Sequence, residues 1–149
     1  MGVYLKELKK LTKQKYNNKN VVNEFGKFDS EAEFYRYLDL LDKKHRGLIK
    51  DLQKQVRYEI VPSIKVMVEK RLKTKTKLIE RVDESARHYT CDFQYTLTSS
   101  GQTIIEDVKS KITAKIRDYG LRRHLMKWLI KRMNEKEGWE RYVFKEVVY

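Results

Sequence analysis

The chain has 149 residues, the size of one domain with a substantial hydrophobic core, and its 40% hydrophobic content argues against global disorder. Lys and Arg number 34 against 21 Asp and Glu, which gives a formal charge of +13. So large a positive excess favours a polyanionic partner. Nucleic acid is the leading candidate and a membrane surface is the rival.

The same sequence disfavours several classes of protein. No apolar stretch approaches the roughly 20 residues that a transmembrane helix needs, and the N-terminus lacks the apolar segment of a signal peptide. The single cysteine, Cys91, excludes an intrachain disulfide, and three scattered histidines do not form a zinc-binding pattern. We therefore expect a cytoplasmic protein that is not secreted and has no membrane association.

Residues 1–24 hold six lysines and the polar run YNNKN. A short helix through Leu5, Leu8 and Leu11 is one interpretation, and a mobile basic arm fits the composition at least as well. We predict a basic N-terminal arm over residues 1–24 and a single domain over residues 25–149.

The first strong element is FDSEAEFYRYLDLLDKKHRG, residues 28–47. Ser30 followed by Glu33 is a capping box, and Gly47 supplies a C-terminal stop. A helix is therefore predicted between them, with Phe34, Leu38 and Leu41 as its apolar positions.

A strand is predicted over residues 53–63, where Pro62 closes it. In the next stretch IKVMV alternates like a strand, and the highly charged EKRLKTKTKLIERVDES, residues 69–85, fits either a long hairpin or a protruding basic loop. RHYTCDFQYTL, residues 87–97, then alternates like a strand. After the turn TSSGQ, TIIEDVKS at residues 103–110 is the return strand.

An amphipathic helix is predicted after Thr113, which we take as its N-cap. Its apolar stripe is Leu121, Leu125, Trp128 and Leu129. WERYVFKEVVY at the end of the chain is predicted to be the last strand. The order helix, strand, strand, strand, helix, strand predicts an α/β fold with a mixed central sheet flanked by helices.

Two acidic residues are expected to meet in this sheet. If the strands on either side of the turn pair as a hairpin, Asp92 comes close to Asp107. Like charges at such a distance repel unless a cation lies between them, and Mg²⁺ suits a pair of carboxylates together with phosphate oxygens. Such an ion could polarise a phosphate and activate water. Lys109 faces the same way as Asp107 and could stabilise the developing charge.

Each of these residues also has a simpler interpretation. Lys109 beside Asp107 is explained by a same-face ion pair, Asp92 by solvation on the polar face of its strand, and Glu33 by the capping box. The pattern D-x-K alone is common. Its position after an apolar strand, with a second Asp-bearing strand and an early helical Glu before it, favours a site.

The arrangement resembles the PD-(D/E)xK nuclease superfamily, whose restriction-endonuclease-like core runs helix, three strands, helix, strand. The segments FDSEAEFYRYLDLL, YTCDFQY, IIEDVKS and YGLRRHLMKWL resemble, more narrowly, small phage-type endonucleases related to Holliday-junction resolvases. The resemblance covers roughly residues 16–148. Cys91 stands where the superfamily name has proline.

The resemblance implies that Asp92 and Asp107 are metal ligands and Lys109 is the catalytic lysine, with Glu33 completing the acidic set. It implies a Mg²⁺ cofactor, for which Mn²⁺ could substitute, a homodimer, and a bacterial or phage-infected cell as the setting. Basic residues around the second helix are expected to contact the DNA backbone, although a solvated helix face explains them equally well: Lys111, Lys115, Arg122 and Arg123.

The leading hypothesis is therefore a metal-dependent DNA endonuclease that hydrolyses phosphodiester bonds, most naturally in branched DNA such as a Holliday junction. A sequence-specific restriction nuclease fits less well, since 149 residues leave little room for a further recognition domain. A transposon-type nicking subunit is an open alternative, because it shares the pattern S-x-x-E. The alternative is a non-catalytic basic DNA-binding protein that keeps the nuclease fold. A basic structural protein such as a ribosome-associated factor explains the charge alone.

Overall fold

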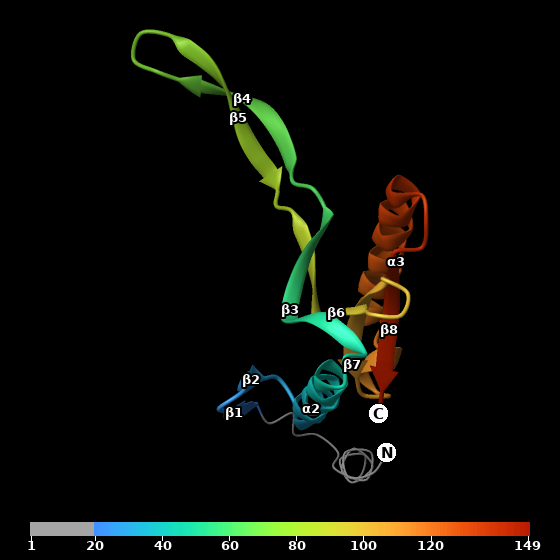
Figure 1. Cartoon of the computed structure of the whole chain (residues 1–149). Coiled ribbons are helices and arrows are strands. Elements are labelled where there is room, and N and C mark those ends of the chain that lie inside the picture. Colours follow the sequence, from blue (N-terminus) through green and yellow to red (C-terminus); the bar gives the residue numbers. More distant parts are fainter. Residues whose placement is uncertain (1–19) are drawn as a thin grey trace. The chain divides into compact units, whose positions relative to one another are not determined.

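A computed structural model describes residues 20–149 of the chain (Figure 1). The elements in chain order are β1 (Val21–Asn23), β2 (Gly26–Phe28), α2 (Glu31–His45), β3 (Ile49–Val61), β4 (Ile64–Arg71), β5 (Thr76–Glu84), β6 (Arg87–Leu97), β7 (Thr103–Lys109), η1 (Thr113–Lys115), α3 (Arg117–Glu137) and β8 (Tyr142–Val148). The predicted basic arm lies mostly outside the described residues, and its last part forms β1, which pairs with β2 in a short hairpin.

Two compact units make up the chain, and each is described here by itself. The first contains the described residues up to Val56 and resumes at Cys91. The second is residues 57–90, which include the β4–β5 hairpin. The strand expected at IKVMV and the hairpin interpretation of residues 69–85 are thus confirmed, whereas the basic-loop interpretation is wrong. The single domain predicted for residues 25–149 stays a prediction.

A mixed four-stranded sheet forms the centre of the first unit, in the order β3-β6-β7-β8. β6 and β7 are antiparallel, with Phe93 opposite Glu106, and β7 and β8 are parallel, with Asp107 opposite Glu146. A parallel neighbour requires a crossover connection, and α3 provides it. The predicted α/β fold with a mixed sheet and flanking helices is confirmed.

Helix α2 begins and ends where its capping residues predict. The Ser30 hydroxyl accepts a hydrogen bond from the Glu33 N–H at 3.1 Å. At the other end Gly47 follows the C-cap with a φ of +73°, a left-handed conformation that glycine adopts without strain. The fully buried hydrophobic position is Leu40, while the predicted Leu38 and Leu41 are only half-buried.

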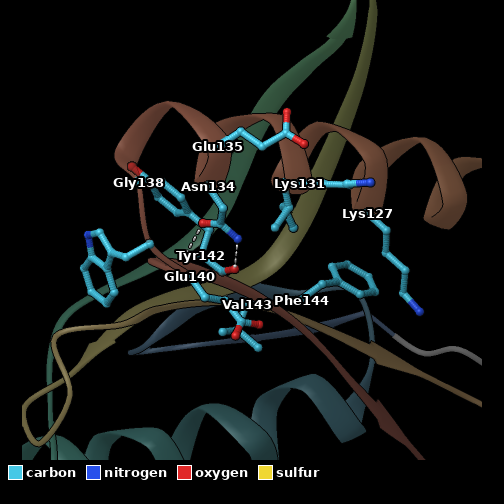
Figure 2. A pocket seen from close by; sticks show the side chains of 11 residues that line it. Lys127, Lys131, Asn134, Glu135, Gly138, Glu140, Tyr142, Val143 and Phe144 are labelled. Carbon is cyan, nitrogen blue, oxygen red and sulfur yellow. Dashed lines mark hydrogen bonds between the residues drawn. The ribbon is translucent and has the colours of Figure 1, made fainter.

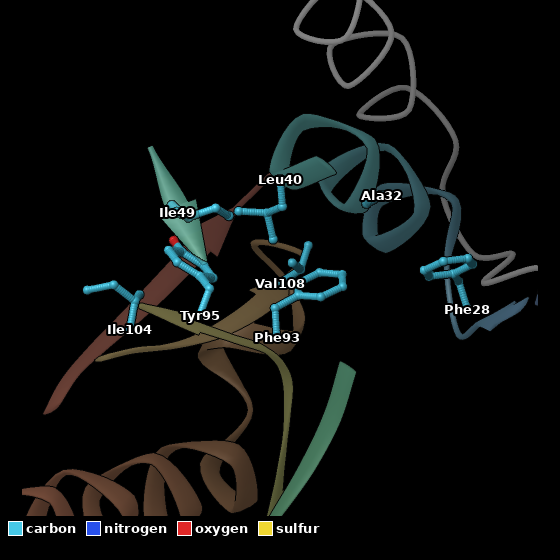
Figure 3. Packing of buried hydrophobic residues seen from close by; sticks show 8 residues of the cluster. All are labelled: Phe28, Ala32, Leu40, Ile49, Phe93, Tyr95, Ile104 and Val108. Carbon is cyan, nitrogen blue, oxygen red and sulfur yellow. The ribbon is translucent and has the colours of Figure 1, made fainter. Parts of the chain in front are cut away.

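The hydrophobic core joins α2 to one face of the sheet (Figure 3). Phe93 and Tyr95 from β6 and Ile104 and Val108 from β7 pack there with Leu40. Figure 3 also shows α2 and α3 on opposite sides of the sheet strands. The alternation of β7 therefore directs Asp107 and Lys109 away from this core, toward the α3 side.

Two expectations about α3 are wrong. Thr113 is not its N-cap: it begins the short η1 turn, and its N–H donates to the Ser110 hydroxyl, so that α3 starts later at Arg117. The buried positions of the helix are Tyr119, Met126 and Ile130, whereas Leu121 and Trp128 of the predicted stripe are exposed. The buried face is set by contact with the sheet, and the sequence did not identify it because apolar and basic residues are mixed around this helix.

Within the part of the chain that the structure describes, no helix is both long enough and apolar enough to cross a bilayer.

Candidate active site

Asp92 and Asp107 form a buried pair of carboxylates at the centre of the sheet. Continuing the β6–β7 register by one residue beyond Phe93 and Glu106 places them opposite one another. Their exposed fractions are only 5% and 1%. Burial, followed by the hydrogen bond with Asp107, raises the pKa of Asp92 to about 8. The pair therefore shares a proton or requires a cation.

The backbone holds Asp92 in place. One of its carboxylate oxygens, Oδ2, accepts a hydrogen bond from the Val108 N–H at 2.7 Å. This bond crosses from β6 to β7 and uses the amide between the two other candidate residues, Asp107 and Lys109. The side chain is thereby positioned by the sheet itself and not by a mobile loop.

Lys109 provides the positive charge beside this pair. Its Nζ lies 3.0 Å from Asp107 Oδ1 and 3.8 Å from Asp92 Oδ2. Burial works to lower the pKa of Lys109, but the two carboxylates outweigh it, and the pKa is raised. The Tyr119 ring, 5.7 Å from Nζ, adds a cation–π contact from α3. The side chain is still about a quarter exposed, so it can reach solvent.

Glu33 enters the same electrostatic environment from the start of α2. Its N–H donates to the Ser30 hydroxyl of the helix cap, and its carboxylate turns back and accepts a hydrogen bond at 3.3 Å from the Asp29 N–H, one residue before the N-cap. Burial raises its pKa, and Lys109 and Asp107 are close enough to influence it in opposite directions. Glu33 thus caps the helix and also contributes a third buried carboxylate near the pair.

Glu106, next in sequence to Asp107, lies on the opposite face. It is fully buried and forms a bidentate pair with Arg36 of α2, with both N–O distances at 2.7 Å. The Tyr95 hydroxyl donates a third hydrogen bond to it at 2.9 Å. Its acceptor oxygens are engaged by the core, so Glu106 belongs to the scaffold and not to the candidate site.

The donor set fits a hard divalent cation that needs few protein ligands. Within residues 20–149, no three carboxylate, imidazole or thiol groups come together as a ready set of metal ligands. Mg²⁺ typically uses one or two carboxylates and fills its remaining positions with water and phosphate. Asp92 and Asp107 fit that requirement.

The four predicted DNA-contacting residues have different surroundings. Lys111, Lys115 and Arg122 are exposed. Arg123 is half-buried and lies 3.4 Å from Glu146 of β8, and the Tyr119 hydroxyl donates to the same carboxylate at 3.0 Å. Arg123 is therefore held within the fold, whereas Lys111 and Lys115 are exposed where a phosphate could reach them.

Sequence reasoning missed Tyr149 as a neighbour of the site. Burial raises the pKa of its hydroxyl, and Ser30, Glu33 and Lys109 are close enough to influence it. Its N–H donates to the Lys109 carbonyl at 3.1 Å. No local pattern could have placed it here, because only the parallel pairing of β7 with β8 brings these residues together.

A separate groove of about 680 Å³ lies between α3 and β8 (Figure 2). Asn134 bridges the two elements: its side chain donates to the Tyr142 carbonyl at 2.9 Å and accepts from the Tyr142 N–H at 2.8 Å. Trp139 and Phe144 also line it. None of the candidate catalytic residues does, so the groove is not part of this site.

The chain matches a protein-family model. No curated protein matches the chain, and neither does any solved structure. The match is to DUF1064, described as a protein of unknown function, and it extends over residues 13–139, most of the chain. The protein therefore belongs to the DUF1064 family.

Proposed function

We propose that this protein is a Mg²⁺-dependent DNA endonuclease with a restriction-endonuclease-like core of the PD-(D/E)xK type. The observation that carries the proposal is the buried Asp92–Asp107 pair with the Lys109 ammonium 3.0 Å from one of its oxygens. Two buried carboxylates on neighbouring strands are costly for the fold, and a divalent ion explains their presence. The net charge of +13 supports a polyanionic substrate.

Asp92 and Asp107 would hold the ion, and Glu33 would orient a water molecule beside it. A bound Mg²⁺ supplies polarisation of the scissile phosphate and a lower pKa for the attacking water. Burial works to lower the pKa of Lys109, but Asp92 and Asp107 raise it overall, so Lys109 would act as a cation and hydrogen-bond donor toward phosphate. Lys111, Lys115 and Arg122 would bind neighbouring phosphates.

Branched DNA is the substrate class that we propose, on the resemblance to Holliday-junction resolvases. Resolution of a four-way junction needs two symmetric cuts, which a homodimer with a two-fold interface would provide. The expected setting is the cytoplasm of a bacterial or phage-infected cell.

One observation favours a second candidate function. Lys109 already lies against both carboxylates, at 3.0 and 3.8 Å, and so partly neutralises the pair without a metal. A non-catalytic DNA-binding protein that keeps the nuclease fold would use Lys109 in this way, as a permanent ion pair.

Single-turnover cleavage of an end-labelled four-way junction distinguishes the nuclease from the non-catalytic DNA-binding protein. Wild type, Asp107→Asn and the matched control Asp118→Asn would each be assayed in Mg²⁺ and in chelator. Asp118 is an exposed carboxylate in the first turn of α3. The nuclease proposal predicts cutting by wild type and by the control in Mg²⁺ only, and none by Asp107→Asn. Binding without cutting by wild type, in Mg²⁺ and in Mn²⁺, would establish the non-catalytic alternative.

A further inference from the structure

The β4–β5 hairpin is a two-stranded ribbon with a tight end (Figure 1). Its register pairs Lys70 directly with Lys77, and the Leu72 N–H donates to the Lys75 carbonyl at 2.8 Å to close the turn. With eight residues in β4, the ribbon is about 25 Å long. Both of its faces are largely exposed, so its sequence is not explained by a core.

Positive charge is concentrated at the end of this ribbon, residues 70–77, which we call the basic tip. Its sequence KRLKTKTK has five basic residues and no acidic one. The acidic residues of β5 come later in the strand, where Glu80 pairs with Lys65 at 3.5 Å and Glu84 with Arg87 at 3.6 Å. Among the described residues, no ion pair includes a basic side chain of the tip.

The cross-strand pair at the tip is unfavourable for the isolated ribbon. Lys70 and Lys77 lie directly opposite one another, and like charges in that position destabilise a strand pair. Two lysines kept side by side, with three further cations nearby, gain stability when a polyanion lies between or beside them.

We infer that the basic tip binds the phosphate backbone of duplex DNA, with the ribbon lying in a groove. The major groove of B-form DNA is wide enough for a two-stranded β-ribbon. Met67 and Leu78, each 61% exposed, lie on the other face of the ribbon beside Glu69 and Glu80, so the face that carries Lys70 and Lys77 is the one turned to the DNA. The inference deepens the proposed function, because it names a second surface by which that function's substrate is held.

Neutralising the tip tests the inference. The tip variant carries Lys70→Gln, Lys73→Gln, Lys75→Gln and Lys77→Gln. The charge-matched control carries four exposed lysines of the other unit changed in the same way: Lys27→Gln, Lys44→Gln, Lys50→Gln and Lys136→Gln. A third protein has the four tip lysines changed to arginine, which keeps the charge. Fluorescence anisotropy with a labelled duplex would be recorded in chelator over a range of salt concentrations.

The tip variant is expected to bind duplex DNA at least about tenfold more weakly, and the slope of log affinity against log salt should fall by about 3 to 4. The control and the arginine variant should retain most of the affinity and slope. Equal weakening in the tip variant and the control would overturn the inference, since it would show a general effect of net charge.

A tip variant that keeps the wild-type affinity and salt slope would also overturn the inference. That result is expected if the ribbon contacts another polypeptide through Met67 and Leu78. Because DNA binding is measured in chelator, where a metal-dependent nuclease cannot cut, the result of this test does not depend on whether the protein is a nuclease. A protein that never cuts DNA can still lose affinity in the tip variant, and an active nuclease can bind DNA without the ribbon.

Discussion

Lys109 is the residue whose chemistry most clearly separates a catalytic site from a structural ion pair. Its ammonium is shared between Asp107 and Asp92, yet its side chain reaches solvent. In a structural pair the lysine would only neutralise the two carboxylates. In a nuclease it would leave that position and donate to a phosphate oxygen as negative charge develops there.

Replacing Lys109 with Met, which keeps the length of the side chain but removes the charge, should lower the rate of DNA cleavage by about 10²–10³-fold. Binding of the same DNA in chelator should change little, because one cation among many is lost. The measurement is a single-turnover rate in Mg²⁺, with the exposed Lys50→Met as control. A variant that cuts at the wild-type rate would show that Lys109 is structural.

Residue alternation was sufficient to distinguish Asp107 from its neighbour Glu106. The two point to opposite faces of β7, and Glu106 is engaged by Arg36 and Tyr95 in the core. The predicted approach of Asp92 to Asp107 also agrees with the structure, since a short turn left only one simple register. Tyr149 could not be found in this way, because its place near Glu33 and Lys109 depends on tertiary pairing.

At the scale of elements, the contact between Arg36 and Glu106 joins α2 to β7 through the core. Both side chains are largely removed from water, and their two hydrogen bonds are short and parallel. Removal of one partner from such a pair leaves the other charge buried without compensation.

Arg36→Met should therefore lower the free energy of unfolding by about 3–5 kcal/mol. The double variant Arg36→Met with Glu106→Gln should recover part of this loss, because no buried charge is then left. Urea unfolding followed by circular dichroism measures both. Arg46→Met, which removes a surface pair with Asp42, should cost less than about 1 kcal/mol. Equal losses in Arg36→Met and Arg46→Met would contradict this account.

The elements were predictable where local signals were strong. Ser30, Glu33 and Gly47 identify α2 from capping chemistry alone. The buried face of α3 was mispredicted because the helix mixes apolar and basic residues around its circumference, and Leu121 proved exposed. The sequence around β4 and β5 was ambiguous because a hairpin exposed on both faces buries no apolar face. Its charged residues therefore do not alternate with apolar ones in the pattern that identifies a strand.

For the whole molecule, the single cysteine reports on global unfolding. Cys91 has no exposed surface, and burial raises the pKa of its thiol to about 12. The native protein should therefore resist a maleimide reagent at neutral pH, and labelling should rise steeply over the same urea range as the loss of helical signal. Rapid labelling without denaturant would show that the sheet opens locally at β6.

The net charge of +13 predicted a polyanionic partner for the molecule as a whole but gave no position for the contact. The structure adds that basic residues gather at the tip of the hairpin and near the start of α3.

The most direct test of the central claim is cleavage of a labelled immobile four-way junction beside a linear duplex of the same sequence, with Mg²⁺ and with chelator. The account predicts paired, symmetric cuts in the junction that require the metal, and little cutting of the duplex. Tight binding of both DNAs without any cut in Mg²⁺ or Mn²⁺ would contradict it, and Asp92, Asp107 and Lys109 would then form only a structural ion pair.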